Sequence, residues 1–238
     1  MVLPDWIFFD CFNTLIDDFD ENGDISGLGP IRHLPVEAGF YASSEDFIGD
    51  YTAWRNRQWP GGEHREIPLP ERFRAILIDR APFRMKEVEP LVQSLLHQFK
   101  ARYPATLRPT PGVREMLDAW SGRVRMGVVS NFFLSDWPAT LLTDHGLSVY
   151  FDFVLDSSAF GWKKPDPRIY REALRLSGLS ADQAGKVLFI GDNPDHDVRA
   201  PLELGMRALY LDRSAERPSP PPPAGIDAIV HWDQFRTD

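Results

Sequence analysis

The chain contains one cysteine, Cys11, among 238 residues, so it cannot form an internal disulfide. It has no apolar stretch approaching the ~20 residues of a membrane span. Positive charge is also in deficit, with a formal net charge of -9, which disfavours binding to duplex nucleic acid. The N-terminal residues MVLPDWIFFD lack the basic segment that begins a signal peptide. We therefore expect a soluble, cytoplasmic protein with neither nucleic-acid nor membrane partners.

Short apolar runs of strand length recur along the chain and alternate with helical patterns. Continuous apolar runs are typical of strands that are buried on both faces of a parallel sheet. Helices are indicated over 113–120 and 169–174, where apolar residues recur at helical spacing. Strands that alternate with helices predict an α/β fold with a doubly wound parallel sheet. The predicted strands are 6–9, 126–130, 151–155, 187–191 and 207–211, with 228–230 as a short edge.

Residues 17–107 interrupt this alternation. They lack strong buried-strand runs and contain helix-like stretches, such as the apolar positions between Leu91 and Phe99. We interpret them as a smaller helical domain inserted after the first strand. The predicted core then comprises residues 1–16 and 108–238.

Four groups of polar residues are predicted to lie at strand ends in this core. In an open parallel sheet, the carboxyl ends of the strands line the crevice that binds ligands. Any one of these residues alone is a weak signal, but their order and placement together are specific. They are Asp10 with Thr14, Ser130 with Asn131, Lys164 before Pro165-Asp166-Pro167, and Gly191-Asp192 with Asp197.

These residues resemble the four motifs of the haloacid dehalogenase superfamily. The first motif is similar to the run Phe9-Asp10-Cys11-Phe12-Asn13-Thr14-Leu15. The second motif is matched by Ser130, the third by Lys164, and the fourth by residues 191–197. The resemblance implies a Rossmann-like core and a helical cap that closes over the substrate. It further implies that Asp10 is the covalent nucleophile and that Mg²⁺ is held by Asp10, Asp192 and the backbone carbonyl of Phe12.

Elementary chemistry supports these implied roles. A carboxylate that attacks an ester forms a covalent intermediate, which divides one difficult step into two. When the target is a phosphate, a cation must offset the repulsion between the two negative groups, and Mg²⁺ prefers oxygen ligands. Lys164 supplies a further positive charge, and Ser130 can donate a hydrogen bond to the transferring group. Asn131 and Thr14 are predicted to bind substrate, and Asp197 to orient Lys164 or a metal-bound water.

The first motif departs from the phosphatase pattern at Phe12. Most phosphatases of the superfamily carry there a second Asp that transfers protons, and Asn13 also replaces the usual Gly. The 2-haloacid dehalogenase branch carries an aromatic residue at the position of Phe12, since a halide leaves without a proton. The fourth motif favours a metal instead, because a metal-free site would gain nothing from crowding Asp192 and Asp197 beside Asp10.

Three functional hypotheses follow. The first is a magnesium-dependent phosphatase that acts on a small phosphorylated metabolite through an aspartyl-phosphate intermediate. The second is a 2-haloacid dehalogenase-like hydrolase, and the third is a non-catalytic binding protein that keeps the fold. Two interpretations are open for a group of aromatic and arginine side chains in the predicted cap. They bind an anionic substrate, or Trp54 packs inside the cap while the arginines face solvent. The group comprises Trp54, Arg55, Arg57, Trp59 and Arg65, with Arg32 as a candidate clamp for a substrate carboxylate.

Overall fold

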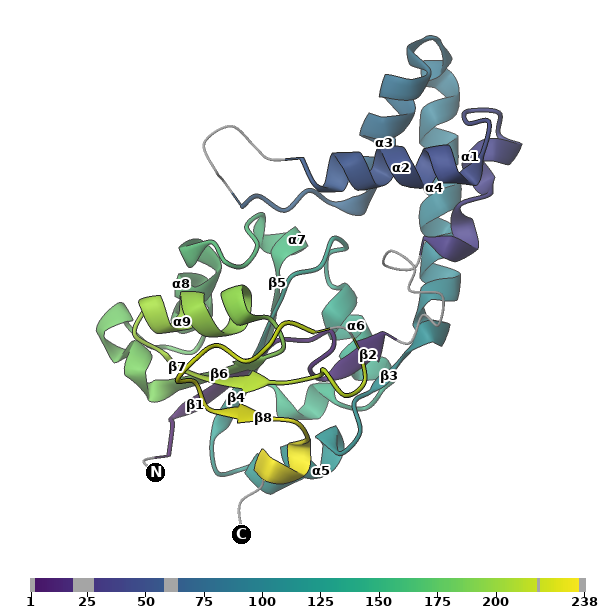
Figure 1. Cartoon of the computed structure of the whole chain (residues 1–238). Coiled ribbons are helices and arrows are strands. Elements are labelled where there is room, and N and C mark those ends of the chain that lie inside the picture. The colour runs from purple at the N-terminus through teal and green to yellow at the C-terminus, as the bar shows by residue number, and fades with distance from the viewer. Residues whose placement is uncertain (1–2, 19–27, 58–63, 218, 236–238) are drawn as a thin grey trace. The chain divides into compact units, whose positions relative to one another are not determined.

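The computed structural model describes residues 3–18, 28–57, 64–217 and 219–235. It divides into two compact units (Figure 1). The first unit comprises residues 1–18, 64–66 and 108–238, and the second comprises 19–63 and 67–107. The second unit therefore arises from an insertion after the first strands, but residues 64–66 within that insertion belong to the first unit.

A six-stranded parallel sheet forms the centre of the first unit, in the order β5-β4-β1-β6-β7-β8. The predicted α/β fold is thus confirmed. β1 is central and pairs with β4 on one side and β6 on the other, so the strand order reverses around it. The strands are β1 (Trp6–Phe9), β4 (Arg125–Ser130), β5 (Phe153–Asp156), β6 (Val187–Gly191), β7 (Arg207–Leu211) and β8 (Ala228–Ile229).

Helices cover both faces of this sheet, as Figure 1 shows for α8 and α9 on one face and α5 on the other. Trp6 and Phe8 of β1 pack into an apolar cluster with residues of α8 and α9. Phe9 points to the opposite face, where its ring meets that of Trp232. The helices of this unit are α5 (Val113–Trp120), α6 (Trp137–Asp144), α7 (Ser157–Phe160), α8 (Pro167–Leu176) and α9 (Ala200–Glu203), with a π-helical turn η6 (Pro194–Arg199).

Local sequence signals explain where the helices of the site begin. α8 begins at Pro167, a residue that suits the first helical position, and the Asp166 side chain caps it by accepting a hydrogen bond from the Arg168 amide. Asp156 caps α7 in the same way through the Ala159 amide. These caps fix the loops that precede each helix.

The second unit is helical, as expected for the insertion. Its aromatic core includes Phe47 and Tyr51 of α2 and Phe73 of α3, all without solvent exposure. The Ser43 hydroxyl caps α2 by accepting from the Asp46 amide. The helices are α1 (Leu34–Glu37), α2 (Ser44–Arg55), α3 (Leu69–Arg80) and α4 (Met85–Arg102).

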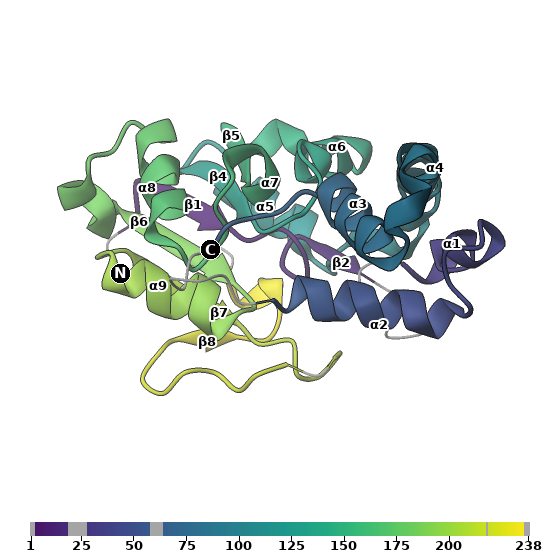
Figure 2. The ribbon, with the colours of Figure 1, turned by 90° about the horizontal axis from the view of Figure 1, so that it is seen from above.

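Two further features complete the fold. β2 (Ile16–Asp18) and β3 (Leu107–Pro109) form a separate two-stranded sheet that the sequence patterns did not predict. Within the described part of the chain, no helix is both long and apolar enough to cross a membrane. Figure 2 shows the same elements from above.

Candidate active site

The ends of three neighbouring strands bring the predicted catalytic residues together. Asp10 follows β1, Ser130 ends β4 and Asp192 follows β6, and β1 is hydrogen-bonded to both of the other strands. One carboxylate oxygen from each of Asp10, Asp192 and Asp197 lies within 4.8 Å of the others. The reversal of strand order around β1 therefore places an acidic cluster at the ligand-binding edge of the sheet.

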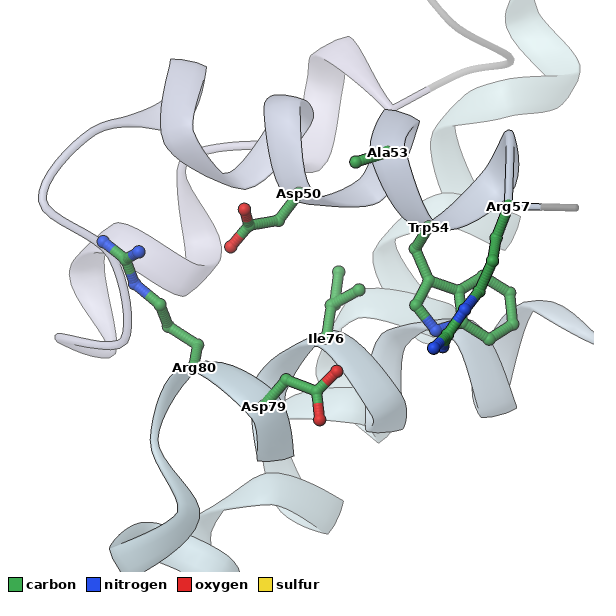
Figure 3. A pocket seen from close by; sticks show the side chains of 7 residues that line it. All are labelled: Asp50, Ala53, Trp54, Arg57, Ile76, Asp79 and Arg80. Carbon is green, nitrogen blue, oxygen red and sulfur yellow. The ribbon is translucent and has the colours of Figure 1, made fainter.

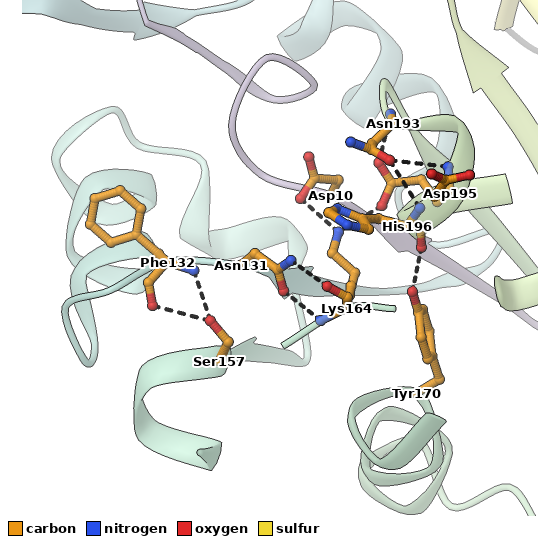
Figure 4. Close-up of polar contacts among 10 residues, drawn as sticks. Asp10, Asn131, Phe132, Ser157, Lys164, Tyr170, Asn193, Asp195 and His196 are labelled. Atoms are coloured by element: carbon orange, nitrogen blue, oxygen red, sulfur yellow. Dashed lines mark hydrogen bonds and ion pairs between the residues drawn. The ribbon is translucent and has the colours of Figure 1, made fainter. Parts of the chain in front are cut away.

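Lys164 is the cation within hydrogen-bonding distance of this cluster. Its buried Nζ donates to Asp10 Oδ1 at 2.8 Å (Figure 4). It also donates to Asp197 Oδ1 at 2.7 Å. Burial alone would lower the pKa of Lys164, but the two carboxylates raise it well above its ordinary value. Lys164 therefore stays protonated, and its positive charge holds the two carboxylates in place.

If Asp10, Asp192 and Asp197 were all ionised, they would carry more negative charge than Lys164 offsets. Burial raises the pKa of Asp10, an effect that Lys164 opposes and Asp197 strengthens. Burial, followed by repulsion from Asp10 and Asp197, raises the pKa of Asp192 to about 8. A divalent cation would relieve this repulsion, and Mg²⁺ takes carboxylate oxygens as ligands. The residues present therefore fit a candidate metal site.

Gly191 makes room for the Asp197 carboxylate. A Cβ at Gly191 would lie 2.3 Å from Asp197 Oδ2, closer than real contacts allow. The same oxygen accepts a hydrogen bond from the Asn193 amide at 3.0 Å. Asn193 in turn begins η6, because its side chain accepts from the amides of Asp195 and His196. The Gly-Asp-Asn sequence thus seats Asp197 beside Lys164.

Two hydroxyl groups near the strand ends are buried without a partner. Ser130 Oγ and Thr14 Oγ have no hydrogen bond within the described residues, and both side chains are fully buried. An unpaired buried hydroxyl costs free energy unless a ligand supplies the partner. Asn131 differs, since its side chain amide exchanges two hydrogen bonds with the main chain of Lys164, at 2.9 and 2.7 Å. Its predicted contact with substrate stays a prediction.

Phe12 lies in an aromatic stack. Its ring stacks on that of Phe132, which stacks in turn on Phe133. The next residue, Asn13, has a φ of 61°, in the left-handed region. Asparagine tolerates this region better than most residues, which explains how it can stand where the family usually has Gly.

Other buried polar contacts of this unit are not assigned a role from the sequence motifs. The Tyr170 hydroxyl donates to the main-chain oxygen of His196. Burial, aided by the positive charge of Lys164, lowers the pKa of His196 to about 4, so its imidazole is neutral at pH 7. The Asp-His-Asp sequence of the fourth motif is the available signal for His196. Nothing local points to the buried ion pair between Asp17 and Arg213, which lie 196 residues apart.

A separate pocket of about 410 Å³ lies within the second unit, between α2 and α3 (Figure 3). It includes Trp54 and Arg57 from the predicted aromatic and arginine group, whereas Arg65 lies in the first unit and stacks over Trp162. Trp59 lies outside the described residues. The pocket holds none of the strand-end residues; it is lined by Asp50, Ala53, Trp54, Arg57, Ile76, Asp79 and Arg80.

Comparison with known proteins gives the class that this fold and site define. The model of the haloacid dehalogenase-like hydrolase family matches residues 4–205, so the chain belongs to this family of hydrolases. The chain is similar to haloacid dehalogenase-like hydrolase domain-containing protein 3 of Homo sapiens, with 38% identity over 125 residues. That match covers 52% of this chain and 47% of the human protein, about half of each.

Other matches reach proteins with named activities. Pyrimidine 5'-nucleotidase YjjG of Escherichia coli is 27% identical over 212 residues, which cover 87% of this chain and 86% of YjjG. Phosphoserine phosphatase of Thermus thermophilus is 42% identical over 80 residues, or 34% of this chain and 30% of that protein. The relatives named for an activity are therefore mostly phosphatases.

Solved structures share the fold. The 2-haloacid dehalogenase from Pseudomonas syringae superposes with a TM-score of 0.73 at 20% identity, over 98% of this chain and 96% of that one. The putative hydrolase YfnB from Bacillus subtilis, bound to magnesium, has a TM-score of 0.62 at 17% identity, over 98% and 97%. At these identities the likeness concerns the fold alone.

Proposed function

We propose that this hydrolase is a magnesium-dependent phosphatase that acts on a small phosphorylated metabolite through an aspartyl-phosphate at Asp10. The observation that carries the proposal is the cluster of Asp10, Asp192 and Asp197, whose carboxylate oxygens lie within 4.8 Å of one another. Lys164 is the one cation hydrogen-bonded to them in the described chain. A metal-free reaction has no use for such crowded negative charge.

The residues of the site have distinct tasks in this reaction. Asp10 attacks phosphorus, and the electron pair of the broken P–O bond leaves with the substrate oxygen. Lys164 orients the Asp10 carboxylate through its hydrogen bond. The unpartnered Ser130 hydroxyl donates a hydrogen bond to a phosphoryl oxygen. Water then attacks the phosphorus of the aspartyl-phosphate and releases phosphate.

The metal would be held by Asp10, Asp192 and the backbone carbonyl of Phe12. When bound, it neutralises charge on the phosphoryl group and on the nucleophile. Asp197 is paired with Lys164 and with the Asn193 amide, so it is suited to orienting Lys164 rather than to binding the metal directly. The names of the related nucleotidase and phosphoserine phosphatase support a small phosphorylated substrate.

A 2-haloacid dehalogenase-like reaction is the second candidate, and Phe12 is the observation that favours it. The side chain at this position carries no proton-transfer group and stacks on Phe132. A halide leaves as a stable anion, so this reaction tolerates the absence of an acid. The same Asp10 would then attack carbon instead of phosphorus.

A panel of phosphate esters and 2-haloacids, each assayed with magnesium and with a chelator, separates the two candidates. We expect phosphate release that requires magnesium and is absent in Asp10→Asn, which keeps the shape of the side chain without its charge. Chelator-resistant release of halide, without phosphate release, would contradict the phosphatase proposal. Measured circular dichroism of Asp10→Asn ensures that the control is folded.

A further inference from the structure

A short segment of the inserted region forms part of the first unit. Residues 64–66 belong to that unit, although the chain on both sides of them forms the other. The Glu66 amide donates to the Gly161 oxygen at 3.1 Å, and the Lys163 amide donates to the His64 oxygen at 2.9 Å. The segment is thus hydrogen-bonded to the strip of main chain that immediately precedes Lys164.

The Glu66 side chain is buried and bonded to Ser157. Glu66 is 7% exposed, and Ser157 Oγ donates to its Oε2 at 2.8 Å. Ser157 Oγ also accepts a hydrogen bond from the Phe132 amide at 2.9 Å (Figure 4). A hydroxyl has one hydrogen, so donating it to the carboxylate leaves the oxygen lone pairs for the amide.

Glu66 decides which way this hydroxyl points. A second acceptor, the Phe132 main-chain oxygen, lies 3.2 Å from Ser157 Oγ. The carboxylate is closer and charged, and hydrogen bonds to charged acceptors are the stronger ones. Without Glu66 the hydroxyl would turn toward Phe132, and the buried polar contacts of this loop would rearrange.

The loop held in this way carries the second motif. Phe132 follows Ser130 by two residues, and the intervening Asn131 is hydrogen-bonded to the main chain of Lys164. Two successive residues of the loop are therefore held by hydrogen bonds. Asn131 is bonded to the main chain of Lys164, and the Phe132 amide to Ser157. The unpartnered Ser130 hydroxyl stands at the start of this doubly held loop.

We propose that Glu66 is a positioning residue that acts through Ser157 to set the loop from Ser130 to Phe132, and with it the hydroxyl that meets the substrate. The main chain of residues 64–66 also holds the residues that precede Lys164, through its hydrogen bonds to Gly161 and Lys163. The role of Ser130 toward substrate rests on the proposed phosphatase function, whereas the hold of Glu66 on the loop does not.

Steady-state kinetics of four variants test the proposal, with p-nitrophenyl phosphate and saturating magnesium. Glu66→Ala should lower kcat roughly tenfold and leave KM within about twofold, the pattern expected when an interaction made only in the transition state is weakened. Glu66→Gln keeps an acceptor for Ser157 and should retain kcat within about threefold. Ser157→Ala should match Glu66→Ala, and the double variant should be no slower than either single variant, because both act in one chain of hydrogen bonds.

Ser158→Ala is the matched control, since Ser158 neighbours Ser157 but its hydroxyl contacts Ser135 instead. It should leave kcat unchanged. Wild-type kcat in folded Glu66→Ala or folded Ser157→Ala would overturn the proposal, as would additive losses in the double variant. Ser157→Ala removes only a hydroxyl and keeps the test open if Glu66→Ala does not fold.

Hydrogen exchange of the Phe132 amide gives a readout that needs no activity. The proposal predicts faster exchange in peptides covering 131–134 in Glu66→Ala and Ser157→Ala, with α8 unchanged and Glu66→Gln close to wild type. Unchanged protection of this peptide would overturn it. A wild type that lacks magnesium-dependent turnover would contradict the proposed function alone, and the exchange rates would still decide the role of Glu66.

Discussion

The ring of Phe12 stacks on the ring of Phe132, with their centroids 4.4 Å apart and 15° between their planes. Phe132 is held by its own stacking on Phe133 and by the hydrogen bond of its amide to Ser157. The residue two positions after the proposed nucleophile is thus part of an aromatic stack that has no proton to donate. Substrates whose leaving groups are stable as anions suit this arrangement best.

Replacing Phe12 by Asp should supply a proton donor and raise the rate for poor leaving groups. We expect a gain of up to about 10²-fold for alkyl phosphates, since general acid–base help is commonly worth ~10²–10⁴-fold. Activated aryl phosphates should gain less, because their leaving groups need little protonation. The measurement is kcat for both ester classes at saturating magnesium, which offsets the added negative charge near Asp10.

Phe12→Leu is the control for this prediction, because it removes the aromatic stack without adding an acid. It should show no selective gain for alkyl phosphates. A folded, metal-bound Phe12→Asp protein with no gain on any alkyl phosphate would show that a missing acid does not limit the reaction.

Replacing Gly191 by Ala should disrupt the pairing of Asp197 with Lys164. The new Cβ would lie 2.3 Å from Asp197 Oδ2, so the carboxylate must move. Loss of a buried ion-pair partner typically costs about 3–5 kcal/mol, and we expect a lower thermal midpoint together with strongly reduced turnover. Gly185→Ala is the matched control, since its Cβ would meet only the Gly205 oxygen at an ordinary 3.6 Å. Wild-type stability and activity in Gly191→Ala would refute this account of Asp197.

Stabilisation by magnesium should increase with pH. The pKa of Asp192 is raised to about 8 in the folded protein without metal, first by burial and then by Asp10 and Asp197. In the unfolded chain the pKa of an Asp is ~4. Because the folded pKa is higher, protonated Asp192 stabilises the metal-free fold at low pH, and this stabilisation is lost as the pH rises toward 8. Magnesium must displace the proton from Asp192, so its affinity rises over the same range and levels off above it.

Thermal midpoints with and without saturating magnesium, measured between about pH 6 and about pH 8, test this linkage. The difference between the two midpoints should widen as the pH rises in the wild type. In Asp192→Asn the difference should be small at every pH, since the amide carries no charge for the metal. A difference that stays constant with pH in the wild type would argue against titration of Asp192 at the site.

Removing a metal ligand should weaken magnesium binding, whereas removing the neighbouring cation should not. Asp192→Ala should weaken magnesium binding at least about tenfold, because a hard oxygen ligand is lost. Lys164→Ala should bind magnesium as well as the wild type or better, since a nearby positive charge is removed. Titration calorimetry measures both. Unchanged magnesium binding in folded Asp192→Ala would remove the main argument against a dehalogenase.

The parts of the fold and site that sequence predicts are those with a local signal. The apolar runs of β1 and β6 are long enough to identify buried strands, and parallel strands end at a common edge. These two signals together predict that Asp10 and Asp192 lie near each other. Thr110 and Pro111 suggest a start for α5, but the helix begins at Val113, after Gly112 in the left-handed conformation that glycine readily adopts.

Contacts without a local pattern could not be predicted. Glu66 and Ser157 lie 91 residues apart, and Asp17 and Arg213 are separated by 196. A single sequence does not say which distant polar residues meet in the interior. β2 and β3 have three residues each, too few to show the period of a strand.

The central claim is that Asp10 becomes phosphorylated during turnover. Enzyme that is quenched in acid while hydrolysing a phosphate ester can be digested and its peptides weighed by mass spectrometry. We predict a phosphoryl group on Asp10 in the wild type with magnesium, and none in Asp10→Asn or in the presence of chelator. Turnover of the ester by the wild type without any phosphorylated Asp10 peptide, or with the phosphoryl group on another residue, would contradict the account.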